Sequence, residues 1–177
     1  MDVHQTASHF DLTGKVILVT GGSRGLGLTM CRSFAAAGAS VVISSRKQEA
    51  CDAAAQEIGE ATGAECVGLA CHVADWEACD ALLEQVYERF GRVDVLVNNA
   101  GMSPLYESLP AVSRELWDKV IGVNLAGPFR LSAVVGERMA AGEGGSIVNV
   151  SSTAAIAPSA AEVPYAAAKA GLNNLTQ

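Results

Sequence analysis

The stretch Val16-Ile17-Leu18-Val19-Thr20-Gly21-Gly22-Ser23-Arg24-Gly25-Leu26-Gly27 begins with an apolar, β-branched run and ends in a cluster of glycines. A strand that leads into such a turn and then into a helix places main-chain N–H groups and the positive end of the helix around an anion. Glycine permits close approach because it has no Cβ atom. The stretch therefore predicts a dinucleotide pyrophosphate site, and the alternative is a turn whose glycines are only structural.

The order of strand and then helix recurs along the chain. Short apolar runs lie at residues 16–19, 41–44, 66–70, 93–98 and 147–150, and stretches rich in Ala, Leu, Glu and Met lie at residues 25–37, 47–62, 76–90, 114–139 and 163–177. Continuous apolar runs are typical of strands that are covered on both faces in a parallel sheet. The pattern predicts an α/β fold, a Rossmann-type doubly wound parallel sheet with helices on both faces and a strand order that begins 3-2-1-4-5.

The chain is expected to form a single domain. Residues 1–11 are polar and mixed and predict a flexible N-terminal arm, whereas residues 12–177 are expected to form one NAD(P)-binding Rossmann domain. The last predicted helix reaches Gln177 without a capping glycine or a further strand for its apolar face to cover. We therefore expect the domain to be incomplete after its fifth strand and fifth helix, with its C-terminal part absent.

Composition excludes several classes of function. The 177 residues carry a net charge of −7, which disfavours a nucleic-acid partner, and no apolar stretch approaches the roughly 20 residues that a membrane span needs. The five cysteines are odd in number and form no Cys-x-x-Cys pair, which predicts reduced thiols and a cytoplasmic location. His4, His9 and His72 lack the spacing of metal ligands, so no metal site is expected. A small-molecule partner remains.

The end of the second predicted strand bears on the choice of cofactor. NAD-binding proteins usually present an Asp or Glu to the ribose 2′-hydroxyl about 20 residues after the glycine turn. Here the sequence is Ser45-Arg46, without an acid. Arg46, and Arg24 in the turn, can instead bind a 2′-phosphate through charge-assisted hydrogen bonds. NADP(H) is therefore the predicted cofactor and NAD(H) the alternative, unless both arginines are merely solvated surface residues.

A second pattern lies near the end of the chain. Tyr165 and Lys169 are four residues apart, which puts them on one face of a helix. Ser152 follows the fifth predicted strand, and Asn124 lies within the fourth predicted helix. Carbonyl reduction needs a proton donor, and an unperturbed tyrosine, with a pKa of about 10, is a poor one at neutral pH. A nearby lysine cation favours the phenolate. Taken singly, these residues could be a turn cap, a helix-bend residue, a surface tyrosine and a solvated lysine.

Three motifs together resemble the classical short-chain dehydrogenase/reductase family from Leu12 onward. They are the Thr-Gly-x-x-x-Gly-x-Gly spacing at residues 20–27, the Asn98-Asn99-Ala100-Gly101 element, and the set of Asn124, Ser152, Tyr165 and Lys169. The resemblance implies an oxidoreductase that transfers a hydride between NADP(H) and a carbonyl or secondary alcohol, with that set as the catalytic tetrad. One departure is His72-Val73, where many members of the family have Asp-Val.

The resemblance also implies roles for individual residues. Tyr165 is the implied acid–base group, Ser152 the hydrogen-bond donor to the substrate oxygen, Lys169 a ligand of the nicotinamide ribose, and Asn124 the holder of a water in a proton relay. The expected cofactor-binding residues are Gly21, Ser23, Arg24, Gly25, Leu26, Gly27, Ser45, Arg46, His72, Val73, Asn98, Ala100, Gly101, Tyr165 and Lys169. Because His72 stands where many members of the family have Asp, the role of that acid does not transfer to it. A structural function for His72 is an equal alternative.

The substrate side carries less information. Met102, Pro104, Leu105, Tyr106, Ile156, Pro158, Val163 and Pro164 are candidates for lining an apolar pocket, or else for loop packing. The family resemblance implies a homodimer or homotetramer of the complete protein. Two further functions stay open: a noncatalytic NADP(H)-binding fragment or regulatory protein, and an extended-family sugar-nucleotide epimerase or dehydratase.

Overall fold

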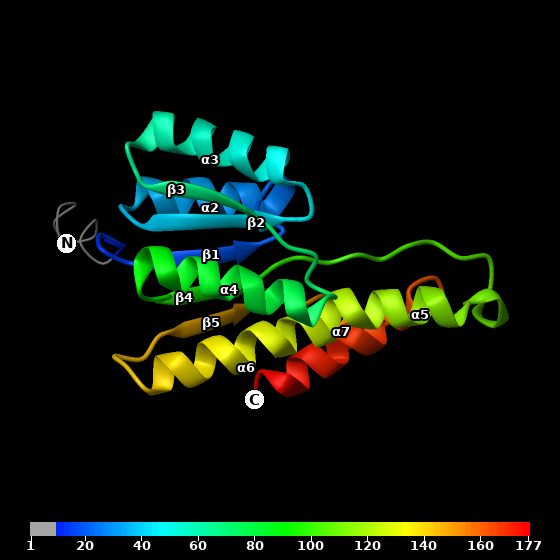
Figure 1. The fold of residues 1–177 in the computed structure, drawn as a ribbon. Helices are drawn as coiled ribbons and strands as arrows, with labels where there is room; N and C mark the ends of the chain where they lie inside the picture. Colours follow the sequence, from blue (N-terminus) through cyan, green and yellow to red (C-terminus); the bar gives the residue numbers. More distant parts are fainter. Residues whose placement is uncertain (1–9) are drawn as a thin grey trace, which may run out of the picture.

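A computed structural model describes residues 10–177, which form one parallel sheet between two layers of helices (Figure 1). The strands are β1 (Val16–Thr20), β2 (Ser40–Ser45), β3 (Cys66–Ala70), β4 (Val95–Asn98) and β5 (Ser146–Asn149), in the order β3-β2-β1-β4-β5. All four neighbouring pairs are parallel. The predicted doubly wound fold and strand order are confirmed. Most of the predicted arm over residues 1–11 lies outside the described residues.

The helices are α2 (Gly25–Ala36), α3 (Gln48–Thr62), α4 (Trp76–Phe90), α5 (Arg114–Ile121), α6 (Gly127–Ala140) and α7 (Val163–Leu175), with short helical turns η1 (Leu109–Ala111) and η3 (Thr153–Ala155). One apolar cluster joins the sheet to α2 and α3, and a second joins its other face to α4 and α6. Alternate residues of β1 divide between the clusters, since Ile17 and Val19 face the first and Leu18 the second. None of the helices within residues 10–177 has the length and apolar character needed to cross a membrane.

Two predicted elements need correction. The predicted helix over residues 114–139 is divided into α5 and α6 by a π-helical segment, η2 (Gly122–Ala126), because the side chain of Asn124 hydrogen-bonds within and beyond the turn. The predicted strand over residues 93–98 begins two residues later, at Val95. The carboxylate of Asp94 is engaged in side-chain contacts just before the strand begins.

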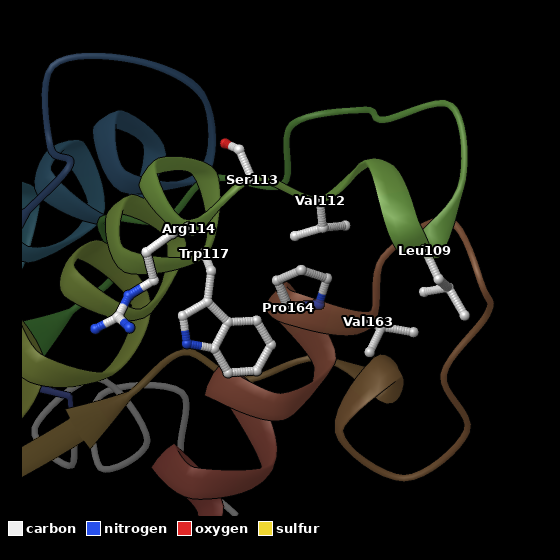
Figure 2. Close-up of a pocket in the computed structure, with 7 residues that line it drawn as sticks. All are labelled: Leu109, Val112, Ser113, Arg114, Trp117, Val163 and Pro164. Carbon is white, nitrogen blue, oxygen red and sulfur yellow. The ribbon is translucent and has the colours of Figure 1, made fainter.

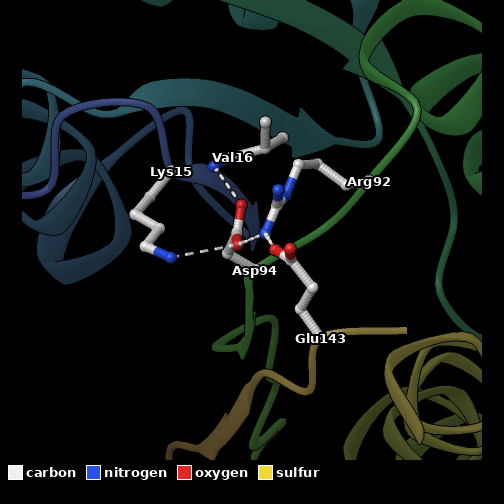
Figure 3. A network of polar contacts seen from close by, with 5 residues as sticks. All are labelled: Lys15, Val16, Arg92, Asp94 and Glu143. Atoms are coloured by element: carbon white, nitrogen blue, oxygen red, sulfur yellow. Dashed lines mark hydrogen bonds and ion pairs between the residues drawn. The ribbon is translucent and has the colours of Figure 1, made fainter. Parts of the chain in front are cut away.

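Asp94 ties together the end of the sheet that lies opposite the glycine turn (Figure 3). Its side chain is 6% exposed and accepts a 2.9 Å hydrogen bond from the main-chain N–H of Val16, at the start of β1. Arg92 and Lys15 lie against the same carboxylate, at 2.5 and 3.5 Å, and Arg92 also contacts Glu143. Burial opposes ionisation of Asp94, but the hydrogen bond and the two cations outweigh it and lower the pKa of this carboxyl.

The two edges of the sheet have different surroundings. At β3, the side-chain amide of Gln48 donates to the carbonyl oxygen of Gly68 at 2.8 Å and accepts from the N–H of Ala70 at 2.8 Å. Gln48 is the first residue of α3, which covers this edge. At β5 the pattern of burial alternates, and Val148 is 47% exposed.

Candidate active site

The parallel strands all end on the same side of the sheet, and their carboxyl ends bring the predicted site residues together there, as in other doubly wound folds. The turn after β1 contains Gly21, Ser23 and Arg24, and α2 begins with Gly25, Leu26 and Gly27. No side chain within residues 10–177 caps this end of α2, and its first turn holds no acidic residue. The first N–H groups of α2 are therefore available to an anion.

Two glycines at the start of α2 are required by the local geometry. Gly25 has φ +55° in an open position, a conformation that disfavours a side chain. At Gly27, an added Cβ would collide with the carbonyl oxygen of Gly21 and would lie 2.6 Å from Nδ2 of Asn99. The start of α2 thus packs directly against the turn, and its N-terminus is held close to the end of β1.

Asn99, which follows β4, and Thr20, at the end of β1, brace the glycine turn through hydrogen bonds between the two strands. Nδ2 of Asn99 donates to the carbonyl oxygens of Thr20 at 2.9 Å and Gly21 at 3.2 Å. The hydroxyl of Thr20 accepts from the main-chain N–H groups of Asn99 and Ala100, each at 3.1 Å. Both residues belong to sequence motifs described above, but neither was among the predicted cofactor-binding residues, although both are polar and lie at the ends of adjacent strands.

Asn98 lies differently from the other predicted cofactor residues. Its side chain is 2% exposed and donates to Ser132 on α6 and to Asn149 on β5, each at 2.9 Å. Neighbouring residues of an extended chain point in opposite directions, so only one side chain of the Asn98-Asn99 doublet can meet the turn. The hydrogen bonds show that it is Asn99. The sequence alone does not indicate which of the two it is.

The ends of β2 and β3 form the far rim of the site. Ser45 contacts the thiol of Cys51 at 3.0 Å, and its carbonyl oxygen accepts from the N–H of Cys71 at 2.8 Å. Arg24 and Arg46 are exposed and form no ion pair with any residue in 10–177. Two cations near this rim are thus free to meet an anionic ligand.

His72 and Val73, which follow β3, differ in burial. His72 is exposed, whereas Val73 is buried and its carbonyl oxygen accepts a hydrogen bond from the Cys79 thiol at 3.4 Å. Val73 also lies against Gly127 at the start of α6, so closely that an added Cβ on Gly127 would collide with the Val73 carbonyl oxygen. Val73 therefore connects the rim to the helix that follows the π-helical segment.

Asn124 is completely buried in the π-helical segment η2. Nδ2 of Asn124 donates to the carbonyl oxygens of Met102 at 2.8 Å and Val120 at 2.9 Å, and Oδ1 accepts from the N–H of Met102 at 3.1 Å. The amide therefore fastens the segment after β4 to the interrupted helix. All the hydrogen bonds of this side chain within the described residues go to main-chain groups.

Lys169 lies next to this amide and beside Tyr165. Its Nζ is 5.7 Å from the centre of the Tyr165 ring, and an added Cβ on Gly101 would be 3.0 Å from Oδ1 of Asn124 and 3.9 Å from Nζ of Lys169. Lys169 is only 3% exposed, and this burial lowers its pKa. Asn124, Gly101, Lys169 and Tyr165 are therefore brought together by β4, η2 and α7.

Ser152 occupies the connection between β5 and α7. Its hydroxyl accepts a 3.2 Å hydrogen bond from the N–H of Ala154 and so caps η3, on which α7 packs. The hydroxyl proton is left for another acceptor. The neighbouring Ser151 has a buried Oγ without a partner among the described residues. The interpretation of Ser152 as a turn cap is thus confirmed. Because the hydroxyl only accepts in this cap, it can still donate its proton to another group.

A hollow of about 620 Å³ opens beside the first turn of α7 (Figure 2). Its lining consists of Leu109, Val112, Ser113, Arg114, Trp117, Val163 and Pro164. Only Val163 and Pro164 belong to the predicted pocket set. Tyr106, another member of that set, forms hydrogen bonds between the segment after β4 and the segment before α7. Leu105 and Ile156 are largely exposed.

Comparison with known proteins assigns the family. The profile described as short chain dehydrogenase matches residues 15–177. Dehydrogenase/reductase SDR family member 4 of Pongo abelii is 38% identical over 166 residues, which are 94% of this chain and 59% of that protein. The chain therefore belongs to the short-chain dehydrogenase/reductase family and spans about three fifths of the length of this relative.

Solved structures agree with the assignment. A metagenomic short-chain oxidoreductase in complex with NADP superposes with a TM-score of 0.88 at 39% identity, covering 93% of this chain and 74% of that one. The L-sorbose reductase of Gluconobacter frateurii, solved with NADPH and L-sorbose, gives a TM-score of 0.88 at 33% identity, covering 92% of this chain and 62% of that one. The fold is shared with these oxidoreductases.

Proposed function

We propose that the protein is an NADP(H)-dependent oxidoreductase that interconverts a carbonyl and a secondary alcohol, with Tyr165 as its acid–base group. The observation that carries the proposal is the buried ammonium group of Lys169 beside the ring of Tyr165, at the same sheet edge as the uncapped end of α2. The pair Tyr165 and Lys169 suits proton transfer, and the uncapped end of α2 suits a dinucleotide. Membership of the family supports their combination as an oxidoreductase site.

The cofactor fits the glycine turn and the rim. The first N–H groups of α2, over residues 25–27, would hold the pyrophosphate, and Gly21 and Ser23 would line the turn around it. Ser45, His72, Val73, Ala100 and Gly101 would border the adenosine and nicotinamide sides, with Asn98 contributing through the sheet beneath. When bound, the nicotinamide supplies or accepts the hydride.

Arg24 and Arg46 support NADP(H) over NAD(H). Both are exposed and free of ion pairs within residues 10–177, and their guanidinium groups suit the additional phosphate of NADP(H). The two solved relatives described above carry NADP and NADPH. NAD(H) remains the alternative cofactor.

The proton chemistry follows from the groups around Tyr165. The phenol of Tyr165 lies on the same helix as Lys169, whose ammonium group is 5.7 Å from its ring centre, and Tyr165 is the group that exchanges a proton with the substrate oxygen. The hydroxyl proton of Ser152 is free to bind the charge that develops on that oxygen. Asn124 keeps the main chain at Met102 in place. Lys169, across Gly101 from Asn124, would bind the nicotinamide ribose.

The partners of the complete protein are proposed to be a small carbonyl or alcohol substrate and further copies of the chain, as a homodimer or homotetramer in the cytoplasm. Trp117 on α5 and Phe129 on α6 are exposed aromatic side chains, which supports association. Light scattering tests it, and a monomer at every accessible concentration would contradict it.

The proposed function is tested by calorimetric titration of NADPH and NADH, with a screen of carbonyl substrates followed by NADPH oxidation. We expect NADPH to bind more tightly than NADH and to be oxidised. The variant Tyr165→Phe should lose at least about a hundredfold in turnover while it binds NADPH as before, because only the proton donor is removed. Binding without turnover by the wild-type protein would support the noncatalytic alternative.

A further inference from the structure

We propose that Tyr106 is a positioning residue, a latch that joins the two segments flanking the site and fixes the start of the helix that carries Tyr165 and Lys169. The inference rests on the proposed function for its catalytic consequence. Its structural basis is a hydroxyl group that makes two hydrogen bonds to the main chain more than fifty residues away.

The two hydrogen bonds run in opposite directions. The Tyr106 hydroxyl donates to the carbonyl oxygen of Ala160 at 2.6 Å and accepts from the N–H of Val163 at 2.8 Å. Val163 is the first residue of α7, and Ala160 lies in the segment before it. One half-buried side chain therefore satisfies both a loop carbonyl and a helix-terminal N–H group.

The beginning of α7 has no capping side chain of its own. The residue before the helix is Glu162, and its carboxylate accepts instead from the N–H and hydroxyl of Ser159, at 3.3 and 3.1 Å. Pro164 has no N–H group, which leaves that of Val163 as the first donor of the helix. The cap is thus supplied from outside the helix, by Tyr106.

The segment after β4 is fixed at both ends by these contacts. At one end, Asn124 holds Met102 through two hydrogen bonds, and at the other end Tyr106 holds Ala160 and Val163. Tyr165 is two residues beyond Val163. A change at the latch is therefore transmitted through less than one helical turn to the proposed proton donor, where small misplacements are costly.

The three tyrosines of the chain provide a matched set of variants. Tyr106→Phe removes the latch, Tyr165→Phe removes the proposed proton donor, and Tyr87→Phe is the control. Tyr87 lies on α4, where its ring is 4.1 Å from the guanidinium carbon of Arg138, and its hydroxyl makes no hydrogen bond within residues 10–177. Each substitution deletes one oxygen atom.

Two readouts decide the proposal. In Tyr106→Phe we expect the Val163 amide to exchange its hydrogen about fivefold faster than in wild type, the effect of losing one ordinary hydrogen bond. We expect kcat to fall about tenfold while KM for NADPH changes less than about twofold, because the proposed phosphate contacts, at the start of α2 and at Arg24 and Arg46, lie away from the latch. Tyr87→Phe should match wild type in both, and unchanged exchange at Val163 or unchanged kcat in Tyr106→Phe would overturn the latch.

The exchange measurement also separates this inference from the proposed function. It needs no substrate, so it reports on the latch even in a protein that oxidises no NADPH. Absence of turnover in the wild-type protein would count against the proposed function, whereas the difference in exchange between Tyr106→Phe and Tyr87→Phe would still support or refute the latch.

Discussion

The ammonium group of Lys169 donates a 2.6 Å hydrogen bond to the main-chain carbonyl oxygen of Val150. Val150 directly follows β5, and Lys169 lies on α7, so this bond joins the helix to the carboxyl end of the sheet. No carboxylate within residues 10–177 forms an ion pair with Lys169. The ammonium group is thus bound by a neutral carbonyl oxygen, close to the ring of Tyr165.

Lys169→Met should reduce turnover about a hundredfold or more, because the cation beside the proton donor is lost. The variant also tests the lowered pKa of Lys169. The pKa in the unfolded chain is about 10.4, so between the folded and unfolded values the unfolded chain binds more protons and stability rises with pH. The free energy of unfolding of wild type, minus that of the variant, should increase from pH 7 to pH 10 in urea denaturation.

Lys119→Met is the control for this series, since Lys119 is exposed on α5. It should leave both turnover and the pH dependence of stability near those of wild type. A stability difference between wild type and Lys169→Met that stays constant across the alkaline range would contradict the lowered pKa.

Asn99→Asp should loosen the glycine turn without changing its shape. The substitution replaces a donor by an acceptor opposite the carbonyl oxygens of Thr20 and Gly21, and an unsatisfied buried group costs about 1–3 kcal/mol. We expect lower stability in urea and a Kd for NADPH that rises about tenfold, measured by calorimetry. A Kd equal to that of wild type would show that the brace is unnecessary for the cofactor.

Asp94→Asn should destabilise the fold without altering the site. It removes the charge that Arg92 and Lys15 contact, and hydrogen bonds to charged groups are worth about 1.5–3 kcal/mol. Because the pKa of Asp94 is lowered by folding, its contribution is present above the unfolded value of about 3.9 and is lost as pH falls through the folded value. The stability difference from wild type should therefore shrink below pH 4 in urea denaturation.

The sequence predicted the fold well because the main signals are local. Apolar runs and glycine turns located every strand, and the alternation with helices predicted the order of the sheet. The sequence offered a helix-bend residue only as an alternative for Asn124, and the π-helical segment itself was not predicted, because it involves a side chain that bonds to Met102, 22 residues away. Tyr106 was predicted only as a pocket-lining or loop-packing residue, and its hydrogen bonds were missed because their partners lie more than fifty residues along the chain.

Gln48 has a consequence for how this sheet can grow. Its side-chain amide binds the carbonyl oxygen of Gly68 and the N–H of Ala70 on β3, which another strand would otherwise bind. The amide therefore takes the place of one peptide group of a neighbouring strand. At the opposite edge strand, β5, Val148 is exposed, and no side chain within the described residues binds the main chain of the strand in this way. Addition of a strand is thus directional: it is blocked at β3 and permitted at β5, the side nearer to Ser152 and Tyr165.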